Sequence, residues 1–201
     1  MYQRMFVLLL ALIVWHLTQT FLMSDIIAKQ KIIDRSHDFV FFKTINDFMK
    51  EHTEFTRYNF ILTSLLIDIN VVYICIKYLM GGNRRSIFIF FVGLILRQIC
   101  QFTNRLPTPN DMIWFHPGIP SMLVTYYVQN DFFFSGHTYV AFCAGLEIIS
   151  SKNFWAKFYG ILFIVYEIML IITTNSHYFM DVYGAVATYF MLSYFYDRYI
   201  K

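Results

Sequence analysis

The chain has 201 residues, of which 58% are hydrophobic and only 14% charged, and its formal net charge is +3. An ordinary soluble domain carries about 25% charged residues, so the composition excludes that class and indicates a protein embedded in a bilayer. We expect membrane lipids as its partners, and no nucleic acid.

Apolar segments of about 17 to 25 residues are needed to cross a hydrocarbon core of about 30 Å. In chain order the candidate spans are Met5 to Met23, Tyr58 to Met80, Ser86 to Phe102, His137 to Ser150, Ala156 to Thr173 and Tyr178 to Tyr196. No linker, internal repeat or low-complexity tract divides them. We therefore predict an all-α, polytopic membrane protein with six transmembrane helices in a single domain, residues 1–201.

The first candidate span begins like a signal peptide, with Arg4 ahead of an apolar core from Met5 to Trp15. A signal peptide ends at a small-residue cleavage site, whereas here the apolar stretch continues to Met23 without a clear one. We expect a helix that stays in the protein, with cleavage as the alternative.

Residues 24–57 are expected to form the first connector on the outer side of the membrane. The segment carries six basic and six acidic residues, so it is locally neutral. Apolar residues recur at helical spacing from Ile32 to Met49, which predicts an amphipathic helix on the membrane surface; a solvated, charged helix is the alternative. His37 and His52 are expected to be surface residues rather than ligands.

The orientation follows from the short connectors. Those at 81–85 and 151–157, and the C-terminal tail at 197–201, are mostly basic. In a six-span chain all three lie on the side of the N-terminus, which the positive-inside rule makes cytoplasmic. The other connectors then face the periplasm, a lumen or the exterior.

Three cysteines, Cys75, Cys100 and Cys143, fall inside candidate spans. Their odd number gives no disulfide framework, and their spacing suits no metal site. We expect them to pack as apolar residues, and we expect a site that needs no cofactor.

Asp68 and Glu147 lie in the middle of candidate spans, where charged residues usually pair or line a wet cavity. A proton relay or transporter would use such residues, and this is the alternative from a different functional class. Neither an inverted repeat nor a broken helix, which many transporters contain, is visible in the sequence.

The stretch RQICQFTNRLPTPNDMIW, residues 97–114, follows the third span on the outer side. Pro107 and Pro109 stop the helix and fix an extended backbone. Arg97 and Arg105 supply donors suited to an anionic phosphate group.

Two histidines stand at matched depth. His137, in SGHT, opens the fourth span, and His177 follows 40 residues later. A crossing takes about 20 residues, so His177 returns to the same membrane face. Asp181, four residues after His177, would share its helical face and hold the imidazole N–H. These three residues predict a catalytic site at the outer boundary.

The motifs FFFSGHT, HYFMD and LPTP together resemble the lipid phosphotransferase branch of the type 2 phosphatidic acid phosphatase superfamily. That branch includes sphingomyelin synthases and the phosphatidylcholine:diacylglycerol cholinephosphotransferases of plants. The resemblance covers about residues 97–196, which we take as the catalytic core region. It implies a six-span helical bundle whose site faces the lumen or the exterior.

The resemblance also implies residue roles. His177 would attack the lipid phosphorus and form a phosphohistidine, with Asp181 orienting it. His137 would protonate the departing diacylglycerol oxygen and then deprotonate the incoming hydroxyl. The expected substrate-binding residues are Arg97, Arg105, Ser135, Gly136 and Tyr178.

Two features depart from the phosphatases of that superfamily. Arg105 is followed by Leu106 rather than proline, and residues 170–176, ahead of His177, contain no arginine. Fewer cations suit a phosphodiester with one negative charge better than a phosphomonoester with nearly two. We therefore favour transfer of a phosphorylated head group to a ceramide or diacylglycerol hydroxyl, with phosphocholine as the favoured head group. The alternatives are a lipid phosphate phosphatase and a non-enzymatic transporter or scaffold.

A phosphocholine head group needs aromatic faces or a carboxylate around its quaternary ammonium. Asp131 is a candidate counter-charge, and the aromatic candidates on the outer side are Trp114, Tyr126, Tyr127, Phe132, Phe133, Tyr139 and Tyr178. Because Trp and Tyr collect at bilayer interfaces in any case, the sequence singles out none of them.

Overall fold

The computed structural model describes the chain except for residues 1, 23–31, 83, 127–131 and 201. Within the described ranges there are seven α-helices and no strand. Their bounds are α1 (Tyr2–Leu22), α2 (Val40–Glu51), α3 (Thr53–Leu79), α4 (Arg84–Thr103), α5 (Gly136–Ile149), α6 (Phe154–Thr173) and α7 (Phe179–Tyr199).

The all-α class is confirmed, and six of the helices coincide within a few residues with the six candidate spans. Three of them, α3, α4 and α6, are long and apolar enough to cross a membrane. The apolar part of α1 is shorter, Tyr2–Thr18, and α5 has only 14 residues. The six-span topology therefore stays a prediction, and the expected end of the first span at Met23 lies outside the described residues.

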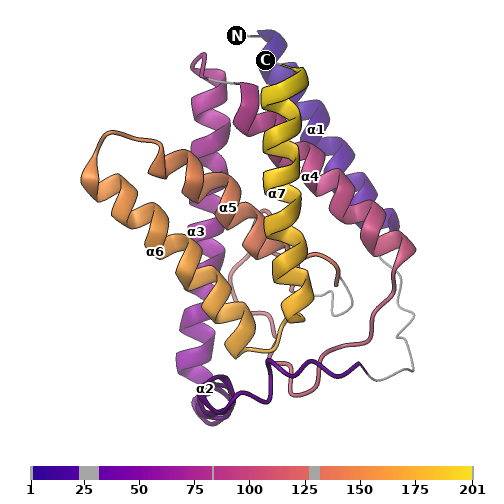
Figure 1. Cartoon of the computed structure of the whole chain (residues 1–201), viewed down its shortest axis with the longest axis vertical. Helices are drawn as coiled ribbons and strands as arrows, with labels where there is room; N and C mark the ends of the chain where they lie inside the picture. The colour runs from indigo at the N-terminus through magenta and orange to yellow at the C-terminus, as the bar shows by residue number, and fades with distance from the viewer. Residues whose placement is uncertain (1, 23–31, 83, 127–131, 201) are drawn as a thin grey trace.

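The helices other than α2 alternate in direction along the chain (Figure 1). The start of α1 and the end of α7 lie at one end of the bundle, where Arg85 donates two hydrogen bonds of 2.9 Å to Asp197. The first residues of α5 and α7 point toward the opposite end, where α2 lies (Figure 1). This arrangement brings His137 and His177 to the same end of the bundle, as their spacing predicted.

Helix α5 packs against α3, α4, α6 and α7, and most extensively against α6. Its crossing with α6 is close because two glycines meet there. A Cβ atom on Gly160 would lie 2.8 Å from the backbone oxygen of Gly145, and one on Gly145 would lie 2.6 Å from Ile164. Neither position has room for a methyl group.

Replacing Gly160 with alanine is therefore expected to lower the free energy of unfolding by about 1–3 kcal/mol, since the new methyl group must push two backbones apart. Thermal unfolding of the purified protein in detergent measures this. Leu162, half-exposed on the same helix, provides the control: Leu162→Ala should shift the midpoint much less. Equal shifts in the two variants would contradict close packing at the crossing.

The acidic residues expected in mid-span have partners. Glu147 accepts hydrogen bonds from Lys77 and Ser86. Asp68 accepts from the Ser121 hydroxyl at 3.0 Å and from the Met122 N–H at 2.9 Å. This pairing is what charged groups need in apolar surroundings.

The connector at 24–57 differs from its prediction, because it is helical only from Val40 to Glu51 and α3 already begins at Thr53. The Asp34 carboxylate accepts hydrogen bonds from the N–H and hydroxyl of Ser36 at 2.9 and 2.7 Å. Such a local side-chain turn competes with helix formation, which accounts for the later start. Residues 24–31 lie outside the described part of the chain.

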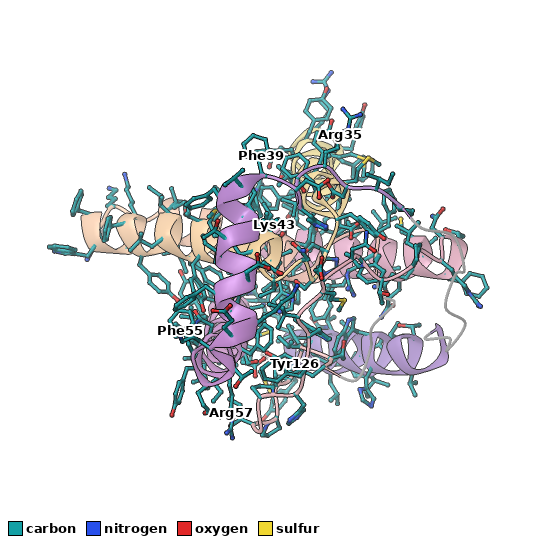
Figure 2. All side chains as sticks on the ribbon, turned by 90° about the horizontal axis from the view of Figure 1, so that it is seen from below. Arg35, Phe39, Lys43, Phe55, Arg57 and Tyr126 are labelled. Atoms are coloured by element: carbon teal, nitrogen blue, oxygen red, sulfur yellow. The ribbon has the colours of Figure 1, made fainter. Side chains whose placement is uncertain are left out.

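Seen from its end, the bundle has α2 lying crosswise (Figure 2). Asn46 and Met49 of α2 are buried against the bundle, whereas Val40 and Phe41 are exposed. A helix at the bilayer surface would have this orientation, with apolar side chains left for lipid. Its place on a membrane remains a prediction.

Candidate functional site

The start of α7 holds His177 and Asp181 together. Nδ1 of His177 lies 3.0 Å from Oδ2 of Asp181. Because His177 precedes the helix, which begins at Phe179, the two do not share a helical face as predicted. Asp181 instead caps the helix by accepting the Tyr178 N–H at 3.1 Å, and the same carboxylate reaches back to the imidazole.

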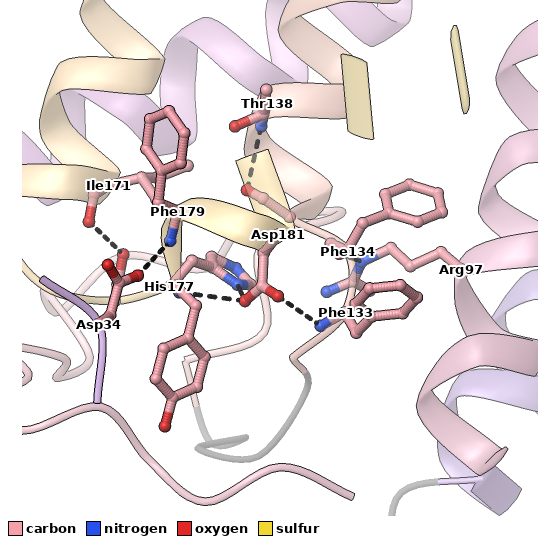
Figure 3. A network of polar contacts seen from close by, with 12 residues as sticks. Asp34, Arg97, Phe133, Phe134, Thr138, Ile171, His177, Phe179 and Asp181 are labelled. Atoms are coloured by element: carbon pink, nitrogen blue, oxygen red, sulfur yellow. Dashed lines mark hydrogen bonds and ion pairs between the residues drawn. The ribbon is translucent and has the colours of Figure 1, made fainter. Parts of the chain in front are cut away.

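Asp181 is fully buried and also connects α7 to the segment before α5. Its Oδ1 accepts the Phe133 N–H at 3.2 Å (Figure 3). Its backbone oxygen accepts the Ser135 N–H at 3.1 Å. Since a carboxylate only accepts, Nδ1 of His177 must carry the proton in this pair. The lone pair of the imidazole then lies on Nε2, which is the arrangement of a nucleophile.

His137 is held by the first turn of α5. The Ser135 hydroxyl caps this helix by accepting the Thr138 N–H at 3.3 Å. Gly136 lies against Arg97, because a Cβ atom there would be 3.2 Å from the guanidinium carbon. Nε of Arg97 donates to the Phe134 carbonyl at 2.9 Å (Figure 3). A glycine at 136 thus lets the arginine approach the turn that carries His137.

These side chains surround one cavity of about 50 Å³. His137, His177, Arg97 and Gly136 line it. The remaining walls come from α1, α3, α4, α5, the loop between α4 and α5, and the turn between α6 and α7: Trp15, Ile67, Leu94, Met112, Trp114, Leu123, Val124, Thr125, Val140 and Ser176. His137 and His177 are both buried. The structure therefore brings both predicted catalytic histidines and one predicted phosphate-binding arginine to a single cavity.

Other predicted binding residues lie elsewhere. Arg105 is exposed and Ser135 is fully buried as a helix cap. The Tyr178 hydroxyl donates to the Pro107 carbonyl at 2.9 Å, and its ring lines a second, mostly apolar pocket of about 470 Å³ together with Leu106. A substrate-binding role for these residues stays a prediction. Tyr127 and Asp131 lie outside the described residues.

A contact from far along the chain supports the start of α7, and no pattern in the sequence predicts it. We call residues 34–37 the strap. Asp34 accepts the Phe179 N–H at 2.6 Å, and Nε2 of His37 lies 3.1 Å from the His177 carbonyl oxygen. His37 is less exposed than expected of a surface residue, since only 9% of its side chain is exposed. His52, in contrast, is exposed as expected.

The strap gives a pH-dependent prediction. Burial raises the pKa of Asp34, but hydrogen bonds from Phe179 and Ser36 outweigh it and hold the pKa below its usual value. The carboxylate therefore stabilises the fold above its unfolded pKa, and this contribution is lost as the pH falls below about 4. Asp34→Asn should lower the thermal midpoint at pH 7, and the difference from the wild type should shrink between about pH 5 and 3. A difference that stays constant would contradict the role of the charge.

No group of three or more His, Cys, Asp or Glu side chains in the described ranges is placed to bind a metal ion. The three cysteines are free thiols. Among the residues that line the cavity, His137, His177 and Arg97 carry the imidazole and guanidinium groups that the sequence predicted for chemistry there.

Comparison with known proteins identifies the family of the chain. A family model described as AtPDCT1/2 matches residues 36–197, about four fifths of the chain. The matched range includes both histidines, Asp181, Arg97 and part of the strap. No curated protein and no solved structure matches the chain.

Proposed function

Because the chain belongs to the AtPDCT1/2 family, a family like the phosphatidylcholine:diacylglycerol cholinephosphotransferases, we propose that it transfers phosphocholine between membrane lipids. The donor is a glycerophospholipid such as phosphatidylcholine, and the acceptor is a lipid hydroxyl, with diacylglycerol favoured over ceramide by the family. Membership in the wider type 2 phosphatidic acid phosphatase superfamily is part of this proposal.

The observation that carries the proposal is the shared cavity of His137 and His177, with Asp181 holding the second imidazole. In the first step Nε2 of His177 attacks phosphorus and the bond from phosphorus to the glycerol oxygen breaks. Protonated His137 gives its proton to that oxygen, and diacylglycerol leaves. Phosphocholine stays on His177 as a phosphoramidate.

The second step reverses the first with a new alcohol. His137, now neutral, takes the proton of the acceptor hydroxyl as its oxygen attacks phosphorus. The bond from phosphorus to Nε2 breaks, and His177 returns to its starting form. A new phosphocholine lipid leaves, so that atoms and charge balance over the cycle without an outside reactant.

The charge of the cavity supports a diester substrate. Arg97 is the single Lys or Arg among the described residues that line it, and Arg105 is exposed. One guanidinium matches the single negative charge of a phosphodiester better than the nearly two charges of a phosphomonoester. This balance favours head-group transfer over dephosphorylation.

The proposed location is a membrane crossed six times, with the site end facing the periplasm, a lumen or the exterior. The support is the alternating direction of the long helices, with the site at the end opposite the start of α1 and the end of α7 (Figure 1). A lipid phosphate at that depth would lie near the bilayer surface, where α2 runs crosswise.

One incubation tests the function. Purified protein in lipid nanodiscs receives phosphatidylcholine labelled in the head group, with diacylglycerol of different chain length, with ceramide, or with neither. A labelled lipid that forms only with acceptor is expected, and its chain length identifies the acceptor. Free phosphocholine without acceptor would instead indicate a hydrolase, and the absence of any product would favour a transporter or scaffold.

A further inference from the structure

Trp114 lies in the cavity but has no part in the two steps described above. Its ring stacks on Tyr126, with centroids 4.8 Å apart, and meets the ring of His137 edge-on at 5.6 Å. Phe60 packs against it at 5.5 Å. The neighbouring Ile113 N–H donates to the Thr174 carbonyl at 2.8 Å. The indole is thus fixed by aromatic contacts and by a backbone anchored to the end of α6.

Two buried nitrogens in this cavity lack a hydrogen-bond partner among the described residues. They are Nε1 of Trp114 and Nε2 of His137, and both side chains line the cavity with Arg97 and His177. Buried polar groups are nearly always hydrogen-bonded, and an exception calls for an explanation. The proposed mechanism explains the nitrogen of His137, which exchanges a proton with substrate, but it does not explain the indole.

We propose, on the basis of the function proposed above, that the indole N–H of Trp114 donates a hydrogen bond to a nonbridging oxygen of the transferred phosphoryl group. An indole nitrogen donates and does not accept, so it cannot compete with His137 for the proton in transfer. A donor held rigidly in a buried site stabilises developing charge without having to reorganise during the reaction. Trp114 is then a second catalytic donor to the phosphoryl group beside Arg97.

Trp114→Phe keeps an aromatic ring and removes the N–H. We expect kcat to fall by about 10- to 100-fold, in the range of a lost oxyanion donor or somewhat below it, with a smaller change in KM. Trp155, which is 72% exposed at the start of α6, gives the matched control. Trp155→Phe should keep wild-type activity.

Stereoselectivity separates this role from mere packing. Phosphatidylcholine with sulfur at one nonbridging position exists as two diastereomers, and sulfur accepts a hydrogen bond poorly. The wild type should react more slowly with the diastereomer that presents sulfur to Trp114. In Trp114→Phe the ratio of the two rates should move toward one. A slower variant with an unchanged ratio, or a variant with wild-type kcat, would overturn the proposal.

A binding measurement keeps this inference separate from the proposed function. With ¹⁵N-labelled tryptophan, the indole resonance of Trp114 is the one missing in Trp114→Phe. Glycerophosphocholine, a soluble phosphodiester, should move its proton downfield. If the resonance shifts but the protein transfers no phosphocholine, the contact between Trp114 and phosphate stands and the proposed transferase function is wrong. If the protein transfers phosphocholine but the resonance does not shift, the transferase function stands and the proposed contact is wrong.

Discussion

Replacing His177 with alanine is expected to lower phosphocholine transfer by at least about three orders of magnitude, because this histidine is the nucleophile of the proposed mechanism and its removal eliminates the covalent route. The variant should also fail to acquire label from phosphatidylcholine. A phosphoramidate is stable in alkali and labile in acid, so wild-type protein quenched in alkali should carry the label and lose it on acidification. The measurement is protein-bound radioactivity after a single exposure to labelled donor.

Two controls test whether the loss of activity is specific to His177 and whether the variant remains folded. His52→Ala removes an exposed imidazole that stacks on Phe48 at 4.1 Å. Neither residue lines the cavity, so this variant should keep full activity. The thermal midpoint of His177→Ala should stay near that of the wild type, since Asp181 still caps α7 through the Tyr178 N–H. Transfer at the wild-type rate by a folded His177→Ala protein would show that the histidine mechanism is wrong.

The helices and the pairing of the two histidines could be predicted because both depend on local pattern and length. Apolar segments placed six helices within a few residues, and Pro107 and Pro109 marked the end of α4. The 40-residue return from His137 to His177 is a matter of helical rise. Such predictions depend on the pattern within one segment or on the number of residues between two motifs.

Contacts between distant segments could not be predicted in this way. Asp34 accepts the N–H of Phe179, 145 residues later. Neither residue type predicts the other as its partner. Trp15 lines the cavity from α1, although its neighbours indicate only an apolar helix. Glu167, an acid within the apolar run of α6, is visible in the sequence. Its partner, the Thr63 hydroxyl at 2.6 Å, is not.

The close approach of Gly136 to Arg97 could not be predicted from the sequence either, because a glycine before a histidine is compatible with many turns. The structure gives the reason as a distance of 3.2 Å from the missing Cβ to the guanidinium. Side-chain approach of this kind depends on how α4 and α5 pack, and packing is decided by the whole bundle rather than by any one stretch.

Replacing His137 with alanine should produce a different defect from that of His177→Ala. In the proposed mechanism His137 serves both steps, as acid toward the departing diacylglycerol and as base toward the acceptor. With phosphatidylcholine both steps slow, and we expect transfer to fall by about 10² to 10⁴-fold. Steady-state rates alone would not separate the two roles.

A donor with a better leaving group separates them. The p-nitrophenyl ester of phosphocholine releases a stable phenolate that needs no proton, so His137→Ala should still be phosphorylated on His177. Release of nitrophenolate should then stop after about one equivalent, because no base remains to activate diacylglycerol, and the alkali-stable label should accumulate on the protein. The wild type should turn over continuously with diacylglycerol, and the double variant with His177→Ala should show no burst. Continuous turnover by His137→Ala would show that another group acts as the base in the second step. Loss of the burst would show that His137 contributes to the first step in some way other than donating a proton.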